Sequence, residues 1–187
     1  MPTSFARLAQ AGMSALLLAG ITLGAAPARA ESREALDAHV RETVQDFYRT
    51  TSAGKELAGK SAGMLVFPGI IKAGIGVGGE YGEGALLVGG KTASYYNIAS
   101  ASIGFQLGVQ EKSVVLLFMT GDALAKFRAS KGWKAGVDGS VAIATLGAGE
   151  ALDTETLKKP IIGFVFSNKG LMYNLTLEGS KITHIDK

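Results

Sequence analysis

The sequence has 187 residues, of which 19 are lysine or arginine, 16 are aspartate or glutamate, and none is cysteine. Without cysteine there is no disulfide framework, no thiol nucleophile and no cysteine to which a lipid could be attached. Only two histidines are present, so a zinc cluster of the usual His/Cys type cannot be assembled. We therefore expect no metal and no cofactor.

Residues 1–30 have the pattern of a secretory signal peptide. Arg7 precedes an apolar run over residues 11–26, and residues 28–30 form an A-x-A cleavage site. The alternative is an uncleaved membrane anchor, for which the apolar run is short. We expect cleavage after Ala30 and export to the periplasm or cell envelope, not as a lipoprotein.

Cleavage would leave a nearly neutral chain. Two of the 19 basic residues and none of the 16 acidic ones lie in residues 1–30, which leaves 17 against 16 and a net charge of +1. A net charge this small gives no electrostatic reason to expect a general nucleic-acid role. The remaining length suits one domain, with a helical lead-in over 31–60 and a β-rich body over 61–187.

The lead-in begins with an amphipathic helix from Ser32, its predicted N-cap, to about Thr51. Its apolar residues recur at helical spacing, and its opposite face mixes acidic and basic residues evenly. A helix that lies on a membrane favours a lysine- and arginine-rich face, so packing against the domain is the preferred alternative. A second, short helix or turn is expected over 52–62.

The stretch 61–90 is rich in glycine and predicts a turn at Pro68-Gly69 and then a hairpin. Its strands would be 71–79 and 84–88, with Glu80 and Glu83 solvated in the connecting turn. The spacing of glycines 74, 76 and 79 matches the G-x-G-x-x-G fingerprint. That motif requires a following helix to receive the pyrophosphate, and the glycines after it exclude one. Nucleotide binding is therefore not expected.

The rest of the chain predicts mainly short strands. They are expected over 64–67, 100–109, 114–119, 137–145, 161–166, 171–178 and 181–186, with a loop containing Tyr95 and Tyr96 over 91–99, a helix over 120–129 capped by Thr120, and a helical turn over 153–158. The predicted fold class is α+β: a mainly antiparallel β-sheet curled into a barrel or sandwich, with an N-terminal amphipathic helix and one or two short helices. Three of the strands have a face of small residues, which either packs tightly or lines a cavity.

Five blocks in this order resemble the SYLF domain: LVFPGIIKAGIGVGGEYGEGALL, YYNIASASIGFQLGVQ, VVLLFM, VDGSVA and FSNKGLMYNLTLEGSKI. The resemblance covers residues 58–182. It implies a module that binds lipid or a membrane surface and is not an enzyme. Some eukaryotic members also act on actin, which is not expected in the compartment to which this signal peptide leads.

The residues themselves offer no catalytic constellation. A Ser/His/Asp triad would need His39 or His184, and the sequence has no G-x-S-x-G elbow. His39 is expected to be solvated and His184 to lie on an edge strand beside Asp186. No catalytic residue is assigned.

Two groups of residues are candidates for lipid contact. The first is Lys126, Arg128, Lys131 and Lys134 around Trp133, the only tryptophan, in which the bases would meet anionic headgroups and the ring would insert. Its alternative is a solvated helix end with the tryptophan in the core. The second group is Lys55, Lys60 and Lys72. The expected function is thus a non-enzymatic phospholipid-binding module of the envelope; the alternative is a structural or partner-binding protein without a lipid ligand, and the protein partner is unknown.

Overall fold

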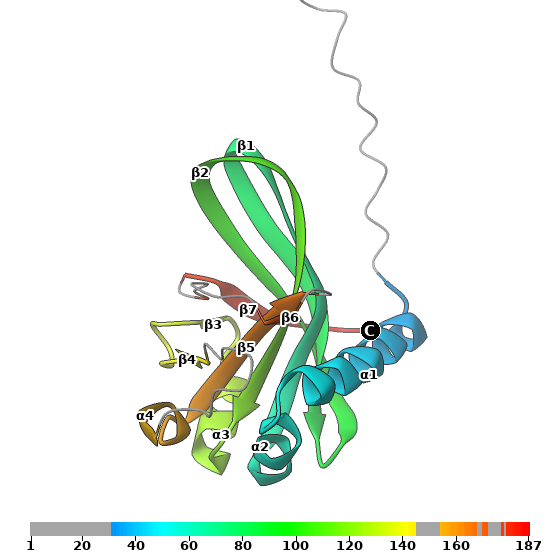
Figure 1. Cartoon of the computed structure of the whole chain (residues 1–187), viewed down its shortest axis with the longest axis vertical. Helices are drawn as coiled ribbons and strands as arrows, with labels where there is room; N and C mark the ends of the chain where they lie inside the picture. Colours follow the sequence, from blue (N-terminus) through cyan, green and yellow to red (C-terminus); the bar gives the residue numbers. More distant parts are fainter. Residues whose placement is uncertain (1–30, 145–153, 168–169, 172–176, 178) are drawn as a thin grey trace, which may run out of the picture. The chain divides into compact units, whose positions relative to one another are not determined.

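The computed structural model describes residues 31–144, 154–167, 170–171, 177 and 179–187, and within these it describes only the backbone of 73–77, 102–109 and 170–171. Residues from Glu31 to Lys187 belong to one compact unit, shown in Figure 1. The expected signal peptide and its cleavage site lie outside the described residues. The elements are α1 (Arg33–Thr50), α2 (Gly54–Lys60), β1 (Gly63–Val88), β2 (Lys91–Phe118), α3 (Gly121–Ala129), β3 (Trp133–Lys134), β4 (Ala142–Ile143), α4 (Thr154–Leu157), β5 (Ile161–Ser167), β6 (Gly170–Leu171) and β7 (Lys181–Ile185).

Helix α1 packs against the sheet, as its charge pattern predicted. Ser32 caps it by accepting a hydrogen bond of 3.2 Å from the amide of Ala35. The apolar stripe faces inward, and the Phe47 ring lies 4.8 Å from that of Phe164 in β5. None of the helices in the described part of the chain has the length and apolar character of a membrane span.

The sheet is built on one long antiparallel hairpin. Strand β1 pairs with β2 from Gly63 opposite Phe118 to Val88 opposite Lys91, and the turn between them uses Gly89 and Gly90, both with positive φ. Strand β2 also pairs with β5 near its end and with β7 near its start. Within the described residues the order is β3-β7-β2-β5-β4, with β4 parallel to β5. This is the predicted α+β fold with a mainly antiparallel, curled sheet.

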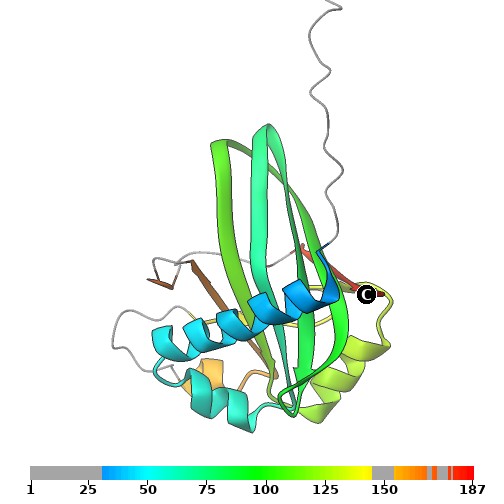
Figure 2. The ribbon, with the colours of Figure 1, turned by 90° about the vertical axis from the view of Figure 1, so that its right-hand side faces the viewer.

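Between its two ends the hairpin bends over on itself. Residues 72–80 of β1 and 100–110 of β2, which we call the arch, pair only with each other in the described part of the chain. Figure 1 shows the two strands bending together at the top, and Figure 2 shows them rising beyond α1. Glycine faces glycine where they bend, at Gly74–Gly108 and Gly76–Gly104, and the register shifts between these two pairs. Cβ-free positions and a bulge are what a sharp bend in a strand pair requires.

Apolar side chains form a core on each face of the sheet. Along 114–118 every residue is fully buried, and alternate residues enter different clusters. Val114, Leu116 and Phe118 join the interior cluster with α3 and β3, whereas Val115 and Leu117 join the cluster under α1 and α2. The prediction of a strand covered on both faces is confirmed.

The two halves of β1 lie against each other where a turn had been predicted. A Cβ on Gly82 would stand 2.8 Å from the carbonyl oxygen of Gly69, and one on Gly84 would stand 2.6 Å from the Phe67 ring. Residues 80–83 continue β1, so the predicted hairpin through them is wrong. At Pro68-Gly69 the chain makes a register shift instead of a turn, and the Ser113 hydroxyl donates a 2.6 Å hydrogen bond to the Pro68 carbonyl. At Gly82 and Gly84 the small residues serve tight packing.

Other elements divide between confirmed and corrected predictions. The Thr120 cap of α3, the helical turn at α4 and the β5 strand are confirmed. The loop predicted over 91–99 is wrong, since Tyr95 and Tyr96 are buried in β2. The strand predicted over 137–145 is reduced to β4. Most of the strand predicted over 171–178 lies outside the described residues.

Candidate lipid-contacting surface

The outer face of the β3–β7 pair carries two lysines side by side. Lys134 is the register partner of Lys181, and both are exposed, while their neighbours Trp133 and Ile182 point into the core. Directly opposite residues of an antiparallel pair have side chains on the same face, with Cβ atoms about 5 Å apart. A Cβ on Gly132 would stand 2.6 Å from Cε of Lys181, so the bare glycine makes room for the lysine stem.

Lys131 lies next to this pair, directly before Gly132, and is exposed. We call Lys131, Lys134 and Lys181 the basic face. The sequence identified the first two residues but missed Lys181, which lies 47 positions after Lys134 in the numbering. Only the β3–β7 register brings the two together, and β3 is too short to be recognised from its residues.

The two bases of α3 do not share one side of the helix. Lys126 and Arg128 are both exposed, and Leu124 and Phe127 face the core. Two residues along a helix are about 160° apart around its axis, so Lys126 and Arg128 flank the buried stripe on opposite sides. One of them at a time can face the same surface as the basic face.

Trp133 is in the core, which decides between its two alternatives and corrects its assignment as a membrane anchor. It is 3% exposed, and its ring makes an edge contact with Phe127 at 5.7 Å between centroids. A Cβ on Gly139 would stand 2.7 Å from the indole ring. Successive side chains of a strand point to opposite faces, so in β3 Trp133 points into the core and Lys134 points to water.

The apolar side chain exposed beside the basic face is Val137, at 76%. It sits on a tight turn in which the amides of Val137 and Asp138 both donate to the Lys134 carbonyl, at 3.2 and 2.9 Å. The amide of Lys134 in turn donates to the Asp138 carboxylate at 2.7 Å. Gly136 has a φ of 84°, which favours glycine there. The turn therefore holds the valine outward next to Lys134.

The second predicted group does not form one surface. Lys55 is exposed on α2, and Lys60 on the same helix pairs with Glu56 at 2.5 Å. Lys72 stands at the foot of the arch, nine residues along β1 from Gly63, which at about 3.3 Å per residue is roughly 30 Å away. The three lysines are close in sequence, but the extended strand β1 places Lys72 far from the two lysines of α2.

Lys72 belongs instead to a small ion cluster. Glu80 lies 2.7 Å from Nζ of Lys112 and 3.6 Å from Nζ of Lys72, and the side chains are 13%, 9% and 27% exposed respectively. We call these three residues the foot cluster, because they join the two sides of the arch at its base. Glu80 was expected to be solvated in a turn; it lies on a strand and is mostly buried.

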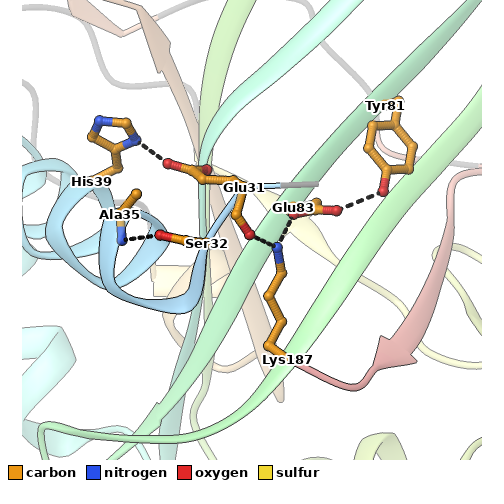
Figure 3. A network of polar contacts seen from close by, with 7 residues as sticks. All are labelled: Glu31, Ser32, Ala35, His39, Tyr81, Glu83 and Lys187. Carbon is orange, nitrogen blue, oxygen red and sulfur yellow. Dashed lines mark hydrogen bonds and ion pairs between the residues drawn. The ribbon is translucent and has the colours of Figure 1, made fainter. Parts of the chain in front are cut away.

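Glu83 is also buried, in the network of Figure 3. Its carboxylate pairs with the ammonium of Lys187 and accepts a 3.0 Å hydrogen bond from the Tyr81 hydroxyl. Lys187 also donates to the carbonyl of Glu31, whose carboxylate lies 2.5 Å from Nδ1 of His39. His39 is thus exposed but has a partner. The network ties α1, β1 and Lys187, two residues after the end of β7, together.

Neither histidine takes part in a catalytic arrangement that the contacts reveal. His184 makes an edge contact with Tyr96, with ring centroids 5.4 Å apart, and its Nδ1 is 4.0 Å from Asp186. Among the described residues, no three histidine or acidic side chains gather as a metal site.

Residues 99–187, from the middle of β2 to the end of the chain, match the family model described as Ysc84, Las17-binding protein actin regulator. Over these residues the chain matches the SYLF-domain family, and the resemblance seen in the sequence is thereby confirmed there. The basic face and the Val137 turn lie within the matched residues, and so does Lys112. No curated protein matches the chain. The description of the family concerns binding, which agrees in kind with a binding module.

Proposed function

We propose that this protein is a non-enzymatic module of the cell envelope that binds anionic phospholipid surfaces through the basic face. The observation that supports it most is the placement of Lys134 opposite Lys181. Like charges directly opposite each other destabilise a sheet, and the nearby Asp138 carboxylate is bonded to a backbone amide. An anionic surface would offset the repulsion between the two ammonium groups.

The chemistry suits weak, reversible attachment. Each base near an anionic surface contributes about 1 kcal/mol, so the three lysines of the basic face contribute about 3 kcal/mol. Insertion of Val137 adds about 1.5 to 2 kcal/mol. The sum corresponds to a dissociation constant of a few tenths of a millimolar. Because Trp133 lies in the core, Val137 on the turn is the side chain that would serve as the apolar anchor.

Export and the absence of catalysis complete the proposal. The signal-like segment 1–30 would deliver the module to the envelope, where phospholipid headgroups are accessible. With no cysteine and with His39 and His184 each paired to a neighbouring carboxylate, the residues favour recognition over reaction. Actin is not a partner we propose in that compartment.

A structural or partner-binding role is the second candidate. It is favoured by the close approach of the two halves of β1 at Gly82 and Gly84, where small residues serve packing. Cross-linking in the envelope would then recover a protein partner, and native mass spectrometry of the purified protein would show no lipid.

The proposal is tested by reversing two charges in two places. K134E/K181E changes the basic face, and K91E/K159E makes the same change in net charge at exposed lysines elsewhere. Each lysine contributes about 1 kcal/mol of binding free energy. For the first variant, binding to phosphatidylglycerol vesicles measured by sedimentation should therefore weaken about thirtyfold or more. The control should change little. Equal loss in both variants would show that net charge, not the basic face, governs binding.

A further inference from the structure

We infer that the foot cluster of Lys72, Glu80 and Lys112 binds one phosphate group. This goes beyond attachment of the basic face to a membrane, because it is a discrete anion site on other strands. The three side chains come from both sides of the arch: Lys72 and Glu80 from the two ends of its β1 segment, and Lys112 from β2.

The cluster has an unbalanced charge. Two ammonium groups share one carboxylate, with separations of 2.7 Å for Lys112 and 3.6 Å for Lys72. The distance to Lys72 exceeds that of a hydrogen bond, so Glu80 holds this lysine by charge alone. The similarly buried pair of Lys187 and Glu83 has one charge of each sign. The foot cluster therefore carries a net charge of +1.

Burial makes that imbalance costly. The side chain of Lys112 is 9% exposed, and a buried charge is tolerated in a protein when it is paired. An ammonium group has three donors, and the contact with Glu80 uses one of those on Lys112. The other nearby acid, Glu111, is exposed and precedes Lys112 on the strand, so its side chain points to the opposite face. An anion between the two lysines would supply the missing negative charge.

The surroundings favour phosphate over a protein carboxylate. Residues 73–79 and 99–110 contain no charged side chain, so the arch brings no acid other than Glu80 to the cluster. A phosphate group has several strong acceptor oxygens and can bridge two lysines as point charges. Its source is either the headgroup of a phospholipid or a phosphate in solution, because both present the same oxygens.

The test follows backbone amide shifts of Lys72, Glu80 and Lys112 by NMR, with the full chain, while inorganic phosphate is added against chloride at equal ionic strength. In the wild type these amides should shift together and saturate. Lys72→Met leaves the balanced pair of Lys112 and Glu80, so the fold is retained and phosphate should bind at least about tenfold more weakly. Glu80→Gln removes the competing charge, and binding should tighten about fivefold. Lys158→Met, which removes an exposed lysine paired with Glu155, is the control.

A purely structural cluster would give a different result. Glu80→Gln would then weaken the fold without tightening phosphate binding, and Lys72→Met would bind phosphate as the wild type does; either result overturns the inference. A second titration with phosphatidylglycerol vesicles identifies the source: shifts with inorganic phosphate alone assign a phosphate in solution, shifts with vesicles alone assign a lipid headgroup, and shifts with both assign the phosphate group that the two share. No shift with either overturns the site. Vesicle sedimentation through the basic face does not depend on this result, so the two proposals fail separately.

Discussion

Gly84 lies so close to Val66 that a Cβ at residue 84 would overlap the Val66 carbonyl oxygen. The two residues belong to opposite halves of β1, which touch here after the strand has bent through the arch. Gly84→Ala should therefore destabilise the fold by about 3 kcal/mol, since overpacking against backbone cannot be relieved by a rotamer change.

The matched control is Gly59→Ala in α2. A Cβ at residue 59 meets nothing within 4 Å, and alanine replaces glycine in a helix with a gain of about 0.5 to 1 kcal/mol. Denaturant unfolding of both variants measures the difference. If Gly84→Ala were as stable as the wild type, the close crossing of β1 would be wrong.

Trp133 should report the core and not the membrane. Because it is the only tryptophan and is buried against Phe127, its emission wavelength should stay the same when vesicles are added. Trp133→Ala should cost about 3 to 5 kcal/mol of stability. A blue shift and gain in intensity on vesicle binding would restore the anchor role that the sequence suggested.

Val137 is expected to contribute to vesicle binding directly. Val137→Asp should weaken sedimentation with anionic vesicles about tenfold or more. The substitution removes about 1.5 kcal/mol of apolar burial and adds a negative charge that the vesicles repel. Val137→Trp should strengthen it. Leu157→Asp, at a 43% exposed residue of α4, is the control. Binding that is indifferent to residue 137 would separate the turn from the lipid-contacting surface.

The pair of Lys187 and Glu83 should stabilise the closed fold. Lys187→Met leaves a carboxylate that is 12% exposed with the Tyr81 hydroxyl as its remaining partner in the network. Breaking a buried pair from one side costs about 3 kcal/mol. Restoring neutrality with Glu83→Gln in the same chain should recover part of the loss, as a double-mutant cycle would measure. Additive losses would mean that the two groups do not interact.

Stability should fall at high pH more steeply than ordinary tyrosines would cause. Burial, and then the hydrogen bond that its hydroxyl donates to Asp37 at 3.1 Å, raise the pKa of Tyr95 above its usual value near 10. The folded state favours the neutral form of Tyr95. The resulting contribution to folding stability is fully present below about pH 10 and is lost as the pH rises through the pKa of the folded state. Tyr95→Phe should flatten the decline of the melting temperature between about pH 9 and 11. An unchanged slope would contradict the assignment.

The sequence predicted the parts of the fold that local chemistry determines. Ser32 and Thr120 are caps, and the apolar stripe of α1 and the doubly buried run at 114–118 follow from periodicity. It did not predict the arch, because Gly82 and Gly84 signal a turn equally well when their distant neighbours Val66 and Gly69 are unknown. The composition around Tyr95 and Tyr96 indicates a loop. Burial on the two faces of the sheet, which composition does not reveal, keeps them in β2.

The candidate site was predictable to a similar degree. Lys131 and Lys134 could be found by their spacing, but Trp133 between them faces inward because β3 alternates, and Lys181 joins them only through pairing with β7. The foot cluster depends on three residues that the bend of the arch brings together. Such contacts between distant positions are set by tertiary structure.

The central claim is that an anionic surface is the partner of the basic face. The most direct measurement is sedimentation of the protein with phosphatidylglycerol vesicles and with phosphatidylcholine vesicles, at about 20 mM and about 200 mM salt. The account predicts binding to the anionic vesicles at low salt, loss of most of it at high salt, and little binding to the zwitterionic ones. Equal binding to both vesicle types, or none to either at low salt, would contradict it.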